Sequence, residues 1–155
     1  RLAARAPRRS GPVTSTLGIR NQASCPPPPM KKSLTQILST LNYLADRKPE
    51  MAFMGGTEGA FAEVSPTRDG AIYVGYYSGN SEWERHSAGD ELVLVLEGAT
   101  TVVLRQQAQE EHVPLAAQEL VVVPAGVWHC FRDSQKLKVL TVTPQPTEHS
   151  LAPDA

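Results

Sequence analysis

The chain has 155 residues, enough for one domain that buries a core without disulfides or metals to hold it together. Its formal net charge of −1 hides an asymmetry: residues 1–29 contain five arginines and no acid, so the remaining ten basic and sixteen acidic residues give the rest of the chain a charge of −6. A mildly acidic domain lacks the basic face that binds phosphate backbones, and we therefore expect no nucleic-acid partner.

Residues 1–29 are rich in arginine, free of acids and closed by four consecutive prolines. Such a segment cannot bury enough surface to offset its chain entropy, so the composition predicts a disordered, basic and proline-rich tail. It also resembles a transit peptide, but it has no initiating methionine and no apolar core region. We expect upstream sequence before a natural start at Met30, with a targeting segment as the alternative.

A short helix is predicted next, behind a serine that can cap its N terminus. Ser33 precedes apolar residues at helical spacing, and these are Leu34, Ile37, Leu38, Leu41 and Leu44. We expect a helical N-terminal segment over residues 30–50, lying against the body of the domain or a partner subunit.

From residue 70 the chain changes to short runs rich in β-branched and aromatic residues, separated by Gly, Pro, Asp and Ser. These runs are AIYVGYYS, ELVLVLE, TTVVLR, ELVVV, WHCFRD and LKVLTVT. Closely spaced strands with no helix between them predict an antiparallel sandwich or barrel. We therefore predict an all-β domain over residues 51–147, followed by a C-terminal tail over residues 148–155.

Two histidines and two glutamates lie at the ends of these predicted strands. Side chains alternate across a strand, so Glu84 and His86 share one face, and Glu91 shares a face with Val93. The turn at residues 124–126 brings His129 onto the next strand. If these faces line a barrel, the four side chains converge at its mouth, and such nitrogen and oxygen ligands suit iron(II), manganese, nickel or zinc.

At these positions the sequence resembles the cupin superfamily. The first motif of that superfamily is Gly, His-x-His, a gap of three or four, Glu, a gap of six and Gly; the matching residues here are Gly79, Glu84, His86, Glu91 and Gly98. The second motif is Gly, a gap of five, Pro-x-Gly, a gap of two, His, a gap of three and Asn; the matching residues here are Gln118, Pro124, Gly126, His129 and Asp133. The resemblance covers residues 70–143.

The resemblance implies a double-stranded β-helix (jelly-roll) cupin barrel, commonly dimeric, that holds a divalent metal with three histidines and one glutamate. It assigns metal ligation to His86, Glu91 and His129, and conditionally to Glu84, which stands in the place of the first histidine. Gln118 and Asp133 also depart from the pattern, at positions that we expect to lie in turns.

The carboxylate of Glu84 changes the expected chemistry. Two carboxylates and two neutral histidines balance the charge of a divalent cation, whereas three histidines and one glutamate leave a charge of +1. The extra oxygen donor favours iron(II), manganese, nickel or zinc over copper and makes the metal a weaker Lewis acid. Without a metal, two carboxylates held close together would raise the pKa of one of them and, with a histidine, could transfer protons. The third interpretation is that Glu84 and His86 are only solvated rim residues of a barrel that has lost its metal.

Other polar candidates have weaker patterns. We expect His112 to be solvated in a turn, His149 to lie in the surface tail, and Cys130 to be buried on the strand face opposite His129. The two cysteines make no disulfide framework, which predicts a reducing, cytoplasmic setting. No apolar run approaches the roughly 20 residues of a membrane helix, so we expect no membrane partner.

The sequence therefore leads to one hypothesis and a competitor from another class. The first is a metal-binding small cupin that acts on or binds a small, polar, oxygen-rich molecule at the barrel mouth, as an oxygenase or isomerase. The competitor is a non-catalytic cupin that binds or senses a small molecule without a catalytic metal. A homodimer is expected in either case, because a small barrel has exposed strand edges.

Overall fold

The computed structural model describes residues 29–107 and 109–153 of the chain. The predicted tail therefore lies, except for Pro29, outside the described residues. Residues 32–155 form one unit by their internal contacts, and the strands and the candidate site all belong to this unit. Among the described residues, no helix is long and apolar enough to cross a membrane.

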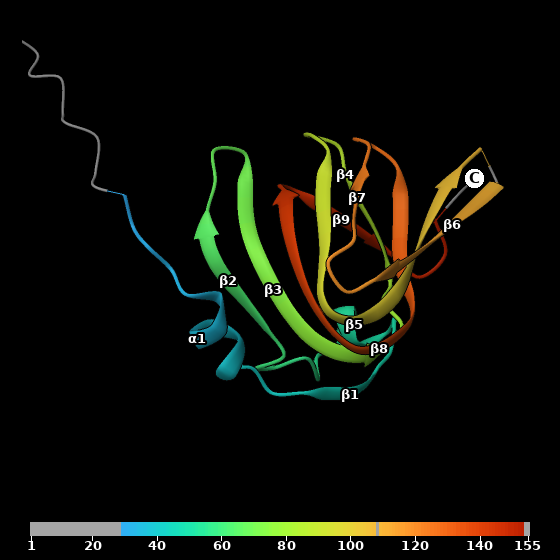
Figure 1. The fold of residues 1–155 in the computed structure, drawn as a ribbon. Helices are drawn as coiled ribbons and strands as arrows, with labels where there is room; N and C mark the ends of the chain where they lie inside the picture. Colours follow the sequence, from blue (N-terminus) through green and yellow to red (C-terminus); the bar gives the residue numbers. More distant parts are fainter. Residues whose placement is uncertain (1–28, 108, 154–155) are drawn as a thin grey trace, which may run out of the picture. The chain divides into compact units, whose positions relative to one another are not determined.

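The described residues are mainly strands (Figure 1). The two short helices are α1 (Leu34–Ser39) and α2 (Met51–Met54). The strands are β1 (Leu44–Arg47), β2 (Phe61–Pro66), β3 (Gly70–Gly79), β4 (Trp83–His86), β5 (Glu91–Gln106), β6 (Gln109–Ala116), β7 (Leu120–Val123), β8 (Trp128–Pro144) and β9 (Thr147–Ser150). β9 thus lies mostly in the segment predicted as a C-terminal tail.

The predicted N-terminal helix is present but shorter than its apolar spacing indicates. Ser33 caps it as predicted, because its hydroxyl accepts a hydrogen bond from the backbone N–H of Gln36. The helix ends at Ser39, where the hydroxyls of Ser39 and Thr40 donate to backbone carbonyls one turn earlier, each at 2.7 Å. Leu44, the last apolar residue of the helical pattern, lies instead in β1, which pairs in parallel with β3.

Two long strands, β5 and β8, connect two layers of sheet. The first half of β5 pairs with β7 and with the second half of β8, which pairs in turn with β3, and β3 pairs with β2. The second half of β5 pairs with β6 and with the first half of β8, which pairs with β4, and β4 pairs with β9. Figure 1 shows both long strands curving from one layer into the other.

A single apolar cluster fills the space between the two layers. It contains Tyr77, Val93, Val95, Val123, Leu137 and Val139 from the first layer and Val102, Leu104, Leu115 and Phe131 from the second. The predicted alternation is confirmed, because Glu91, Val93 and Val95 are buried whereas the intervening leucines are partly exposed. Cys130 faces the other side of β8, as predicted, and packs with Trp83 and Val103.

The all-β, jelly-roll prediction is confirmed. The strand order is β1-β3-β8-β4-β9, with β2 on β3 and with β6 and β7 on β5, so hydrogen bonding among the described strands does not close into a ring. Gln118 lies in a turn, as expected, with φ of 69°. Asp133 does not: it lies within β8, with φ of 52°, in the stretch where the pairing with β5 becomes irregular.

Candidate metal centre

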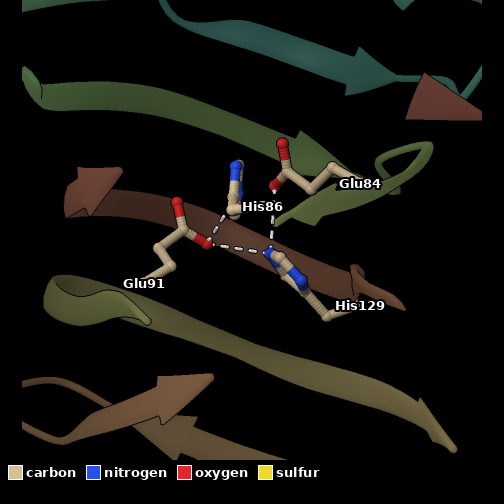
Figure 2. Close-up of side chains that lie close together, drawn as sticks. All are labelled: Glu84, His86, Glu91 and His129. Atoms are coloured by element: carbon tan, nitrogen blue, oxygen red, sulfur yellow. Dashed lines mark hydrogen bonds and ion pairs between the residues drawn. The ribbon is translucent and has the colours of Figure 1, made fainter. Parts of the chain in front are cut away.

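The four residues proposed from the sequence come together in the space between the sheet layers (Figure 2). Glu84 and His86 lie on β4, Glu91 begins β5, and His129 lies on β8. One potential ligand atom from each residue lies within 4.8 Å of those of the other three. The structure therefore brings the four predicted residues together, although Glu84 and His129 lie 45 residues apart in the sequence.

Two hydrogen bonds donated by backbone N–H groups hold the two motifs in register. The N–H of Gly126 donates to the backbone carbonyl of His86 at 2.8 Å. The N–H of Ala125 donates to Oδ1 of Asp90 at 2.8 Å. These bonds attach the turn that precedes His129 to both ends of the loop between β4 and β5. The same two bonds therefore position His129 relative to Glu84 and Glu91.

His129 and Glu91 form the closest pair of the cluster, with His129 Nε2 2.8 Å from Glu91 Oε2, and both side chains are fully buried. The other ring nitrogen, Nδ1, lies 3.2 Å from the carbonyl oxygen of Val127, which can only accept a hydrogen bond. Nδ1 therefore carries a proton. A proton must then lie between Nε2 and Glu91, or a cation must bridge them, because two lone pairs would otherwise face each other across 2.8 Å.

In the absence of a metal, the pair is an ion pair. Burial opposes the charge on each group, but it is outweighed by their mutual interactions. The nearby carboxylates of Glu84 and Glu91 raise the pKa of His129 to about 10. The hydrogen bond with His129 and the charge interactions with His129 and His86 lower the pKa of Glu91 to about 2. Without a metal, the proton on His129 is therefore held firmly between the two groups.

His86 presents an unsatisfied nitrogen to the cluster. Its Nδ1 lies 3.2 Å from the hydroxyl of Thr147 on β9. Its Nε2 is buried, lies 3.5 Å from Oε2 of Glu91, and has no hydrogen-bond partner among the described residues. A buried polar atom without a partner is costly, and metal-binding histidines commonly have one nitrogen fixed by a hydrogen bond while the other faces the metal. The donor set and this orphaned atom both fit a divalent metal.

Glu84 completes the cluster from the side open to solvent. Its Oε1 lies 3.6 Å from Nε2 of His129, and its side chain is 17% exposed, compared with 2% for Glu91. It is therefore the cluster residue best placed both to ligate a metal and to meet a small molecule that enters from solvent.

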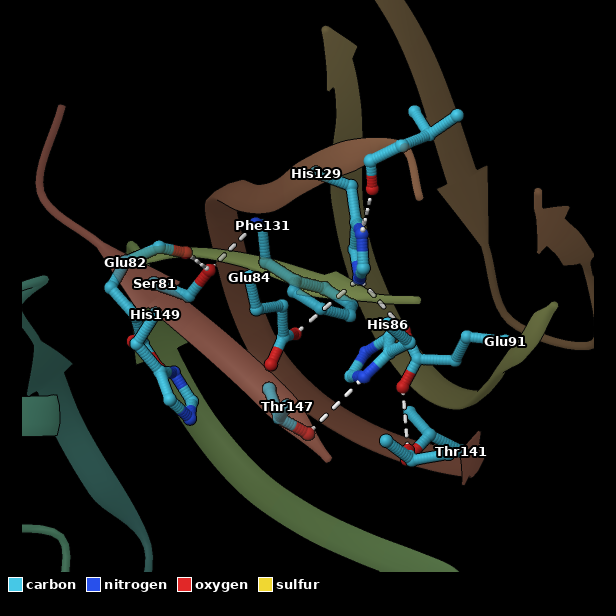
Figure 3. Close-up of polar contacts among 12 residues, drawn as sticks. Ser81, Glu82, Glu84, His86, Glu91, His129, Phe131, Thr141, Thr147 and His149 are labelled. Atoms are coloured by element: carbon cyan, nitrogen blue, oxygen red, sulfur yellow. Dashed lines mark hydrogen bonds and ion pairs between the residues drawn. The ribbon is translucent and has the colours of Figure 1, made fainter. Parts of the chain in front are cut away.

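Threonines behind the cluster were missed by the sequence reasoning. The hydroxyl of Thr143 donates to Oε1 of Glu91 at 2.5 Å and lies 2.7 Å from the hydroxyl of Thr141. Figure 3 shows Thr141 beside Glu91. These hydroxyls fix the carboxylate that His129 contacts. The alternation of threonine with apolar residues in LKVLTVT was the available signal, because it places Thr141 and Thr143 on the inward face with Val139.

A cavity of about 330 Å³ adjoins the cluster and includes Glu84 and Glu91 in its lining. This volume lies at the lower end of the range for small-molecule sites. Three polar residues that the sequence analysis did not assign to the site also line it: Arg47, Glu82 and His149. His149 lies on β9, with Nδ1 3.2 Å from Oε1 of Glu82, rather than in a surface tail. His112 is exposed, as predicted, but it lies in β6 rather than in a turn.

One family model and several solved structures resemble this chain. The family model described as "Cupin domain" matches residues 76–143. A cupin-2 domain containing protein from Shewanella frigidimarina is 21% identical, covering 62% of this chain and 90% of its own, with a TM-score of 0.48. A cupin superfamily protein from Desulfitobacterium hafniense is 19% identical, covering 54% of this chain and 74% of its own, with a TM-score of 0.48.

A hydroquinone 1,2-dioxygenase, solved in complex with Cd²⁺ and 4-hydroxybenzonitrile, is 19% identical, covering 54% of this chain and 63% of its own, with a TM-score of 0.47. The search of curated proteins returned no match. The matched model spans the second half of β3 through β8 and contains all four residues of the cluster. The match identifies residues 76–143 of this chain as a cupin domain.

Proposed function

We propose that Glu84, His86, Glu91 and His129 bind a divalent metal, namely iron(II), manganese, nickel or zinc, and that the protein acts on a small, polar, oxygen-rich molecule in the adjoining cavity, as an oxygenase or isomerase. One observation carries the proposal. Two buried histidines and two carboxylates converge with their ligand atoms within 4.8 Å, and one of those atoms, Nε2 of His86, is buried without a partner among the described residues. Nitrogen and carboxylate ligands of this kind suit the metals named.

The balance of charge supports a metal over a purely hydrogen-bonded site. Glu84 and Glu91 carry two negative charges, which a divalent cation neutralises while the histidines stay neutral. A proton on His129 neutralises only one of them and gives Nε2 of His86 no partner. A metal satisfies both histidines and both carboxylates at once.

Each part of the site has a separate task in this proposal. A bound divalent metal would supply Lewis acidity toward an oxygen atom of the substrate. Thr143 and Thr147 hold Glu91 and His86 in orientation through their hydroxyls. Tyr73, Tyr77 and Phe131 line the cavity with aromatic surface. Such walls exclude water from part of the cavity and would strengthen polar contacts made there.

A non-catalytic function is the second candidate. The ion pair between His129 and Glu91 is complete without a metal, and the cavity beside it is large enough for a small ligand. A metal-free protein with these features would bind or sense a polar molecule through Glu84 and its neighbours. Metal content separates the two candidates.

We further propose a homodimer in a reducing, cytoplasmic setting. The outer apolar face of β5 and β7, which comprises Leu92, Leu94, Leu120 and Val122, supports the dimer. Leu120 and Val122 are about half exposed, and their neighbours on β5 are partly exposed. The buried free thiol of Cys130 is consistent with a reducing environment.

The test of the proposed function is the metal content of the purified protein, measured by elemental analysis. Parent protein is compared with Glu84→Ala and His129→Ala, and His112→Ala serves as a control because His112 is exposed and outside the cluster. Near-stoichiometric metal that is lost in both cluster variants and kept in the control is the expected result. A parent without metal, even after reconstitution with each of the four metals, would overturn the metal proposal in favour of the metal-free candidate.

A further inference from the structure

We propose that Arg47 binds a carboxylate of the substrate in the cavity, and that Glu82 positions Arg47 for this task. The inference rests on the proposed function, because it assumes that the other end of the substrate meets the metal-binding cluster. It assigns a substrate class: a small molecule with metal-binding oxygens at one end, an apolar body and a carboxylate at the other end.

Arg47 is a cation built into the wall of the cavity. It lies on β1, its side chain is only 11% exposed, and Nη2 donates to Oε2 of Glu82 at 3.0 Å. Its guanidinium carbon lies 4.7 Å from the ring centre of Tyr77 and 5.0 Å from that of Phe61. Stacking and the single ion pair fix the plane of the guanidinium, and the N–H groups on its other nitrogens are the donors offered to a ligand.

Glu82 has both of its oxygens occupied by protein side chains. Oε2 accepts from Arg47, and Oε1 lies 3.2 Å from Nδ1 of His149. The residue is buried, with 4% of its side chain exposed. A carboxylate that is already bonded on both sides has little capacity left for a ligand, so we assign Glu82 to positioning rather than to substrate contact.

A second metal ion is a poorer occupant of this end of the cavity. Glu82, Glu84 and His149 do place potential ligand atoms within 4.8 Å of one another, and Glu84 belongs to both groups (Figure 3). The guanidinium of Arg47, however, already neutralises Glu82 and would repel another cation. The positive charge of Arg47 favours an anion in its place.

The total charge of the cavity permits an anionic ligand. With a divalent metal bound, the metal and Arg47 contribute +3, and Glu82, Glu84 and Glu91 contribute −3. No net negative charge then opposes a carboxylate, and the guanidinium offers it paired donors in a partly dry site. Aromatic residues share the lining with these polar groups, which suits a substrate with an apolar body.

The test is isothermal titration of zinc-loaded protein with three probes: catechol, 2,3-dihydroxybenzoate and 3,4-dihydroxybenzoate. All three carry the same metal-chelating oxygens, and the two acids place a carboxylate at different distances from them. Zinc prevents redox turnover during the titration. In Arg47→Gln, we expect at least one of the two acids to bind about tenfold more weakly or worse, the loss typical of a hydrogen bond to a charged group. Catechol should bind within about twofold of the parent value.

Arg68→Gln is the matched control, because Arg68 is 91% exposed and pairs only with the neighbouring Asp69 among the described residues. Arg47→Gln leaves Glu82 buried without its partner, so the double variant Arg47→Gln/Glu82→Gln is measured beside it, and the zinc content of each variant is determined first. The inference would be overturned if Arg47→Gln lost affinity equally for catechol and for the acids, or lost no affinity for either acid. A parent that binds no zinc would instead overturn the proposed function; titration of metal-free parent and Arg47→Gln with benzoate then decides the role of Arg47 separately.

Discussion

Glu84 on β4 and His129 on β8 are direct partners in the antiparallel pairing of their strands, and Oε1 of Glu84 lies 3.6 Å from Nε2 of His129. Directly opposite residues of paired strands have adjacent side chains on the same face. Strand pairing therefore places the first ligand position of one cupin motif against the histidine of the other. The ligand position at which this chain departs from the superfamily pattern thus lies beside His129.

Glu84→His restores the three histidines and one glutamate of the superfamily pattern and should retain metal. Glu84→Ala removes a donor without replacing it and should weaken metal binding by about tenfold or more, as loss of groups around a metal typically does. Competition with a chromophoric chelator for zinc measures both affinities. Parent-like affinity in Glu84→Ala would remove Glu84 from the ligand set and leave it free for proton transfer.

The metal-free protein should be most stable in mildly acidic solution. The pKa of His129 is raised to about 10 in the folded state, so its contribution to stability is complete below about pH 6.5 and is lost as the pH rises toward 10. The pKa of Glu91 is lowered to about 2, so its contribution is complete above about pH 4.5 and is lost as the pH falls toward 2. Urea unfolding of chelator-treated protein should therefore give a larger free energy of unfolding at pH 5.5 than at pH 8.5.

The control for this pH dependence is His129→Asn. In this variant the free energy of unfolding should decrease less above pH 6.5 than in the parent. Metal binding should show the opposite trend, strengthening as the pH rises, because the metal must displace the proton on Nε2 of His129. Equal stability of the metal-free parent at pH 5.5 and pH 8.5 would contradict the ion pair that the distances indicate.

The residues of the cluster were predictable because strand alternation and motif spacing both depend on local sequence. Glu84, His86, Glu91 and His129 each lie within one of the two motifs, and all four were predicted to converge. Arg47 and His149 were not, because they enter the cavity from β1 and β9, outside the matched domain. The apolar spacing around Leu44 fits a helix, and only its pairing with β3, a contact distant in sequence, makes it a strand. Such contacts leave no local pattern.

Two motif glycines should differ in their tolerance of alanine, although both have positive φ. Gly98 has φ of +80°, and a Cβ there would overlap the backbone oxygens of Gln135 and Lys136. Gly126 has φ of +79°, and a Cβ there would meet nothing within 4 Å. Gly126→Ala should cost about 1–2 kcal/mol of stability, the ordinary penalty of this backbone region. Gly98→Ala should cost several times more, or prevent folding.

Denaturant unfolding of both glycine variants measures the difference, and each variant serves as the other's control because the backbone penalty is nearly the same. Equal losses would mean that the strands around Gly98 can move apart without cost. The comparison also tests the fold itself, because the close approach at Gly98 is where the long strands β5 and β8 cross between layers.

The outer apolar face of β5 and β7 should hold the proposed dimer together. Val122 is 49% exposed and is paired with Leu92 of β5, so a lysine at this position would place a charge in the contact between two copies. Val122→Lys should shift the protein toward monomer at micromolar concentration while leaving its thermal stability and metal content unchanged, because position 122 points away from the core. Sedimentation velocity over a hundredfold range of concentration measures the shift.

Leu151→Lys is the control, because Leu151 is similarly exposed, at 53%, but lies outside this face. A parent that sediments as a monomer throughout, or an equal shift in both variants, would count against this face as the dimer interface.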